Sequence, residues 1–81
     1  VLYKGVSERC DASGKTLRAI AAQEREIYKS IFKDKCKPGC EVKVIVEVAD
    51  LGPCAVTLNG DIAEGRWMKI SIFAFCRKRF Y

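Results

Sequence analysis

Gly14-Lys15-Thr16 stands just ahead of a helix-like run and raises the question of a phosphate-binding loop. In such a loop, backbone amides and the lysine ammonium hold the phosphates of a nucleotide. The motif also needs a glycine five residues before Gly14, and Arg9 occupies that position. The preceding stretch, YKGVSER, is charged, whereas the motif follows a buried strand. The sequence therefore predicts a turn and a helix start here, and not a phosphate site.

Cysteine thiols are the second source of chemistry, and the chain has five: Cys10, Cys36, Cys40, Cys54 and Cys76. Two of them flank a Pro-Gly turn at the spacing of half a structural zinc site, but no second close pair completes four thiolates. Such a cysteine density in a short chain is typical of secreted, disulfide-stabilised proteins. We expect two disulfides, one spare thiol and no metal; the alternative is a reduced intracellular protein with buried thiols.

Spacing alone does not determine which cysteines pair. We favour Cys10 with Cys76, which would join the two ends of the chain, and Cys36 or Cys40 would then reach Cys54. Cys10 with Cys54 stays open as an alternative. The odd cysteine also leaves room for a disulfide-linked dimer.

Catalytic chemistry has little support, because the chain contains no histidine, the commonest general base. Glu24 and Glu26 would lie on different sides of a helix, and Asp61 and Glu64 lie in a turn. None of them forms a recognisable acid–base pair. We therefore predict a non-catalytic protein without a cofactor.

The last segment, GRWMKISIFAFCRKRFY, interleaves aromatic and basic residues and has no acid. Such residues can stack on bases and hold phosphates, and they are also enriched where proteins bind each other. The plainer alternative is a second small core followed by a solvated basic tail. We favour a protein partner over nucleic acid. The candidate contact residues are Arg66, Trp67, Lys69, Phe73, Phe75, Arg77, Lys78, Arg79 and Tyr81.

Length and composition indicate one folded domain, residues 1–81, with 49% apolar residues and a net charge of +5. No stretch approaches the roughly 20 apolar residues of a membrane span, so we predict none. The chain starts at Val1 without a signal-peptide pattern, which is typical of a processed or trimmed product.

One helix is predicted over residues 15–34, where apolar residues recur at steps of three and four. Asp11 or Ser13 is the expected N-cap, and Pro38-Gly39 ends the segment. The apolar positions are Leu17, Ile20, Ala21, Ile27, Tyr28, Ile31 and Phe32.

Four strands are expected around that helix. An edge strand includes Val1–Val6, and alternating valines predict a half-buried strand over 42–49. A Gly52-Pro53 turn would lead to a strand over 54–58, with Val56 and Leu58 inward, and an Asn59-Gly60 turn to a strand over 66–76. Met68, Ile70 and Ile72 share one face of that last strand. The predicted fold is α+β, a single helix packed on a four-stranded antiparallel sheet.

From Glu41 onward the chain resembles small secreted effectors of plant-pathogenic fungi. The stretch VEVADLGPCAVTLNGDIAEGRW is similar to the later strands of the ToxB-like (MAX) effectors, with a cysteine opening a strand, an LxGD turn and then a tryptophan. That resemblance implies a six-stranded all-β sandwich as the alternative fold, with Cys10 as the partner of Cys54. The order of strand, helix and sheet is instead similar to the ribonuclease-like fungal effectors, in which the first and last cysteines join.

Both resemblances imply a small secreted virulence protein that acts by binding a host protein. Two other functions stay open: a basic module that binds RNA or another nucleic acid, and a secreted toxin or inhibitor. The former predicts affinity that falls steeply with salt, and the latter predicts leakage or enzyme inhibition.

Overall fold

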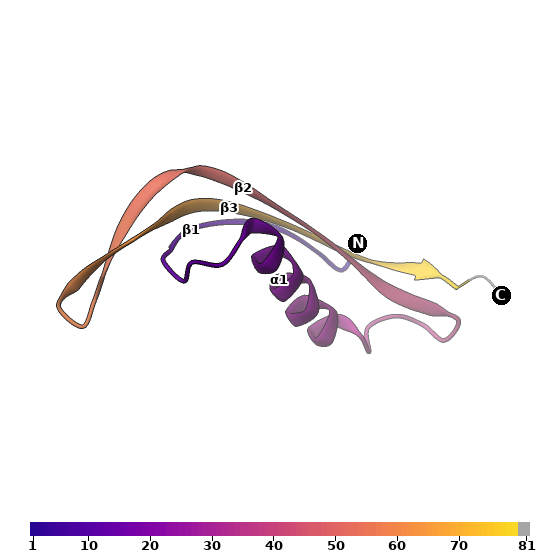
Figure 1. Cartoon of the computed structure of the whole chain (residues 1–81). Coiled ribbons are helices and arrows are strands. Elements are labelled where there is room, and N and C mark those ends of the chain that lie inside the picture. Colours follow the sequence, from indigo (N-terminus) through magenta and orange to yellow (C-terminus); the bar gives the residue numbers. More distant parts are fainter. Residues whose placement is uncertain (80–81) are drawn as a thin grey trace.

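The computed structural model describes residues 1–79 and contains one helix and three strands (Figure 1). In chain order they are β1 (Tyr3–Asp11), α1 (Leu17–Phe32), β2 (Cys40–Leu58) and β3 (Asp61–Lys78). The predicted α+β class with a single helix is confirmed. The alternative all-β sandwich is wrong, because the 16 residues of α1 are helical.

The described sheet has three antiparallel strands in the order β1-β3-β2, so the expected fourth strand is not seen. The segments predicted as separate strands over 42–49 and 54–58 are one strand, β2, because Gly52-Pro53 does not reverse the chain. Asp50 lies opposite Met68 and Gly52 lies opposite Trp67, which leaves Leu51 as the extra residue of a β-bulge. Gly52 has a φ of +122°, a backbone angle that residues with a Cβ atom rarely adopt.

The reversal falls at Asn59-Gly60, as predicted, and both residues have the positive φ of a tight hairpin turn. Beyond the end of β1, residues 53–65 of β2 and β3 continue as a two-stranded ribbon, the hairpin arm (Figure 1). The arm makes the molecule long, 51 Å against 22 and 20 Å. Leu58, expected to point inward, is 55% exposed because the helix does not reach the arm.

The core lies between α1 and one face of the sheet, which arches over the helix (Figure 1). The alternating positions predicted to be inward supply it, since every second side chain of β2 and β3 points to the helix. Ile27 and Ile31, predicted on the buried helix face, are 45% and 56% exposed because they lie at its margin. The buried residues are Ile20, Val42, Val44, Met68, Ile70, Ile72 and Ala74. No helix within residues 1–79 is long and apolar enough to cross a membrane.

Three aromatic rings fasten the start of β1 to the end of α1. The Tyr3 ring stacks on Tyr28 at 5.3 Å and on Phe32 at 5.9 Å between centroids. It also lies over Gly5, where a Cβ would collide with it. Burial raises the pKa of the Tyr28 hydroxyl, as expected for a phenol that packs among other rings.

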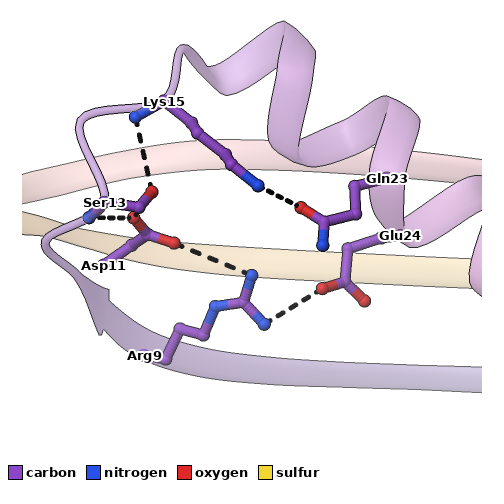
Figure 2. A network of polar contacts seen from close by, with 6 residues as sticks. All are labelled: Arg9, Asp11, Ser13, Lys15, Gln23 and Glu24. Carbon is purple, nitrogen blue, oxygen red and sulfur yellow. Dashed lines mark hydrogen bonds and ion pairs between the residues drawn. The ribbon is translucent and has the colours of Figure 1, made fainter.

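The loop between β1 and α1 is held by its own polar contacts, shown in Figure 2. Lys15 Nζ donates to Gln23 Oε1 at 2.9 Å, so the lysine of the rejected phosphate motif contacts the helix. The N-cap is Thr16, whose hydroxyl accepts from the Ala19 amide at 3.1 Å, and neither Asp11 nor Ser13 as predicted. Asp11 accepts hydrogen bonds from Ser13 instead, and these hold the pKa of its carboxyl below the usual range.

The disulfides are Cys10–Cys54 and Cys36–Cys76, and Cys40 is the free cysteine. Two disulfides and one spare thiol were predicted, but the favoured Cys10–Cys76 pair is wrong, and so is a bond from Cys36 or Cys40 to Cys54. The alternative pair, Cys10–Cys54, is the one observed. Cys10 lies opposite Trp67, and nine residues of strand, about 30 Å, separate that position from Cys76. Four thiols in disulfides also rule out the four-thiolate zinc alternative.

The Cys10–Cys54 disulfide joins the two outer strands across β3. Their Cα atoms are 5.9 Å apart, whereas the outer strands of a flat three-stranded sheet are separated by about 10 Å. The end of β1 must therefore leave the plane and pass over β3, and it does so at Gly65. A Cβ on Gly65 would lie 2.7 Å from the Asp11 carbonyl carbon and 2.9 Å from the Ala12 Cα.

Gly65→Ala is expected to lower the free energy of unfolding by about 1–3 kcal/mol, because backbone must move to admit the methyl group. Urea unfolding followed by Trp67 fluorescence measures the change. Ala63→Gly, in the same strand, is the matched control and should lose no more than about 1 kcal/mol. Equal stability of Gly65→Ala and the wild type would contradict the crossing.

Peptide mapping of the unreduced protein should recover Cys10 linked to Cys54 and Cys36 linked to Cys76, with alkylation confined to Cys40. Replacing Cys36 and Cys76 by Ser is expected to cost about 2–5 kcal/mol, because the disulfide closes a long loop in the unfolded chain. Recovery of Cys10 linked to Cys76 would overturn the assigned connectivity.

Candidate functional site

The face of the sheet opposite α1 has no second layer over it among the described residues. Because side chains alternate along a strand, the neighbours of each buried residue point to this side. We call it the uncovered face. It comprises Lys4, Val6 and Glu8 of β1, Glu41, Lys43, Ile45, Glu47 and Ala49 of β2, and Trp67, Lys69, Ser71, Phe73, Phe75 and Arg77 of β3.

Its centre is apolar and aromatic. Phe73 and Phe75 of the central strand are tilted against each other with centroids 5.2 Å apart. Ile45 lies directly across from Phe73 and is 43% exposed, and Val6 on the other margin is 61% exposed. These side chains form an apolar strip that reaches across all three strands.

A shallow hollow of about 320 Å³ interrupts the strip at Ser71. Ser71 is the one small side chain between Lys69 and Phe73 on this side of β3, and Val6 lies directly across from it. Val6, Ile45 and Phe73 line the hollow. A cavity of this kind can receive one anchoring side chain of a binding partner.

Charges of both signs surround the apolar strip. The cations are Lys4, Lys43, Lys69 and Arg77, and the carboxylates are Glu8, Glu41 and Glu47. Glu8 and Lys69 are cross-strand neighbours, and Arg77 donates to Glu41 at 2.8 Å. The face is therefore nearly neutral, although the chain carries +5.

The structure separates the predicted contact residues into two groups. Trp67, Lys69, Phe73, Phe75 and Arg77 share the uncovered face, as their alternation implies. Of the remaining candidates that the structure describes, Arg66, Lys78 and Arg79 do not join that strip.

Arg66 points to the other side and donates to Asp50 at 2.6 Å, so it holds the β-bulge. Lys78, in the opposite phase of β3 from Arg77, lies across from Cys40. The Arg79 side chain lies 4.0 Å from Glu41, and Tyr81 lies outside the described residues.

Sequence reasoning missed the contributions of β1 and β2 to this face. The position of Ile45 could have been noticed, because it is an apolar residue on the side of the alternating run 42–49 that was expected to face solvent. Val6 and Lys4 carried none, since the register that sets them beside Phe73 and Ser71 depends on long-range strand pairing.

Two carboxyl groups with lowered pKa values serve structural contacts. The Arg77 guanidinium, by its hydrogen bond, holds the pKa of Glu41 below its usual range. The Gly52 amide donates to Asp50 at 2.9 Å, and this bond together with Arg66 lowers the pKa of Asp50. Within residues 1–79, no cluster of cysteine and carboxylate side chains could hold a metal ion.

Comparison with protein-family models, with curated proteins and with solved structures finds no match for this chain.

Stability is expected to fall as the pH drops below about 4, the ordinary range of carboxyl groups. A lowered pKa in the folded state stabilises the protein above the unfolded value, and that contribution is lost on protonation. Asp50→Asn removes part of it, so the gap in urea midpoint between wild type and variant should narrow from pH 7 to pH 3. A gap that stays constant over this range would contradict the role of Asp50.

Proposed function

We propose that this chain is a secreted, non-catalytic protein of the effector type, which binds a host protein through its uncovered face. The observation that carries the proposal is the aromatic strip of Phe73, Phe75 and Ile45, which no second layer covers within the described residues. An antiparallel sheet with one solvated face commonly has polar side chains on that face, and a cluster of aromatic residues there is typical of an interaction site.

The chemistry of the strip suits a protein partner. Aromatic residues dominate the energetics of protein interfaces, and they act best beside a cavity and within a polar rim. Phe73 borders the hollow at Ser71, and Trp67, 39% exposed, lies on the same face. A partner that covered this strip would bury it much as a second layer of the fold would.

The charge arrangement supports a protein partner over a nucleic acid. Nucleic-acid binding depends on cations that are free to neutralise phosphates. Here Glu41 already pairs with Arg77, and Asp50 pairs with Arg66, so two of the predicted phosphate contacts are occupied. The carboxylates of Glu8 and Glu47 would also lie against a phosphate backbone.

The disulfides support secretion, and the sequence resemblance supports the effector class. Two disulfides fit an oxidising compartment, where such bonds form and persist. The resemblance of the later strands to fungal effectors leads us to propose a plant protein as the partner. The toxin or inhibitor alternative predicts a different readout, leakage or loss of an enzyme's activity.

The test begins with proteins that the immobilised chain retains from a plant extract, each then purified and measured directly. Ile45→Asp and Phe73→Asp are expected to weaken binding at least about tenfold, because each places a charge in the buried centre. Ile62→Asp, on the hairpin arm, is the matched control and should leave affinity unchanged. Circular dichroism and urea unfolding verify that each variant folds.

Partners that bind all three variants equally would overturn the role of the uncovered face. Fluorescently labelled poly(U) RNA separates the rival class. Affinity for it that falls steeply between about 0.05 and 0.5 M NaCl, and that Lys43→Gln and Lys69→Gln weaken, would support the nucleic-acid alternative instead.

A further inference from the structure

A second surface lies along the outer edge of β2, away from the aromatic strip. β2 is the last strand of the sheet, so its outer backbone amides and carbonyls have no strand partner within residues 1–79. A groove of about 350 Å³ runs between this edge, at residues 43–46, and α1. An exposed strand edge beside a groove is the geometry in which an extended peptide adds to a sheet.

The helix leaves room at this place because its side chains here are small. Ala21 and Ala22 of α1 and Val44 of β2 are among the residues that line the groove. Val44 is only 4% exposed and belongs to the core, so the part of β2 that borders the groove is fixed by core packing.

The groove is basic, unlike the uncovered face. The described residues that line it include the cations Arg18, Arg25 and Lys43 and no carboxylate. Arg18 and Arg25 make none of the ion pairs recorded among the described residues. Arg18 and Arg25 are two turns apart on one side of α1, so their Cα atoms are about 10 Å apart. Alternate side chains of an extended strand are about 7 Å apart, and the long arginine side chains can span the difference.

We propose that this groove binds an extended acidic segment of a partner protein, which adds to β2 as a further strand. Side chains of an added strand alternate between the two sides of the sheet. Acidic residues would point to the helix side, toward Arg18 and Arg25. The residues between them would lie beside Ile45 on the uncovered face, where apolar side chains fit best.

The occupant is a different protein because a second copy fits poorly. Antiparallel pairing of two β2 edges about Ile45 would match Lys43 with Glu47 of the other copy. The same two-fold arrangement, however, would bring the helices side by side on one face of the sheet. Arg18 and Arg25 would then meet the same arginines of the second copy, and like charges at close range oppose association.

This site goes beyond the proposed function, which rests on the uncovered face. The two surfaces share the margin at Ile45 but depend on different side chains, since Arg18 and Arg25 belong to α1 on the other side. Variants of these arginines therefore test the groove without touching the aromatic strip.

The probe is a short fluorescein-labelled peptide of alternating Val and Glu, measured by anisotropy with the full chain. Two controls accompany it: the same peptide with Lys for Glu, and the same peptide with alternate backbone amides methylated. The protein variants are Arg18→Glu with Arg25→Glu, and Lys35→Glu with Lys37→Glu as the charge-matched control, because Lys35 and Lys37 are exposed and do not line the groove.

Saturable binding of the Val-Glu peptide supports the proposal if two losses accompany it. The double arginine variant should lose at least about tenfold in affinity while the double lysine variant loses little, and both control peptides should bind at least about tenfold more weakly. Equal binding of the methylated peptide would show plain charge attraction and overturn strand addition. Three other outcomes would each overturn the acidic-peptide assignment. The first is no binding of the peptide, and the second is its displacement by poly(U) RNA at equal charge. The third is a dimer of the chain, seen by light scattering, that the arginine variants abolish.

Discussion

The packing of a single helix on one side of a three-stranded sheet governs the rest of this molecule. Ile20 of α1 is buried against Met68 and Ile70 of the central strand, and the inward valines of β2 complete the contact. Because α1 is the only helix among residues 1–79, it can bury one face alone. The opposite face of the sheet must then be exposed to solvent or covered by another molecule. The same holds for the outer edge of β2, which α1 does not cover.

So small a core needs further constraints, and they lie where the helix does not reach. Cys36–Cys76 fastens the segment after α1 to β3, and Cys10–Cys54 fastens β1 to β2 over Gly65. On the chain-entropy model, a loop of this length contributes about 4 kcal/mol per disulfide. The stacking of Tyr3 on Tyr28 adds a third attachment, at the opposite end of β1. The Cys10–Cys54 disulfide and the Tyr3 stacking hold the two ends of β1, an edge strand that has little buried surface of its own.

The elements that local sequence determines could be predicted, and those that depend on long-range pairing could not. The spacing of apolar residues was sufficient for α1 and for the inward face of β2 and β3, and Asn59-Gly60 marked the hairpin. Gly52-Pro53 has the composition of a turn but forms a bulge, because β3 continues past it and keeps β2 in register. The choice between Cys76 and Cys54 as the partner of Cys10 could not be made from the sequence, since the register of β1 on β3 decides which cysteine Cys10 can reach. The aromatic half of the uncovered face was visible in the alternation of β3, whereas its margins on β1 and β2 follow from the same register.

An unpaired strand edge beside a partly exposed aromatic face would ordinarily favour aggregation, and the chain limits this in several ways. Lys43 and Glu47 place charges on the edge strand, and the bulge at Gly52 followed by Pro53 interrupts its regular pairing pattern. Arg18 and Arg25 add positive charge beside the edge, which repels another copy of a chain that is itself basic. The same charges attract an acidic strand. The positive charges of Arg18 and Arg25 thus oppose self-association and favour an acidic partner at the same time. This double effect supports the proposal that the edge of β2 is a binding surface with electrostatic specificity.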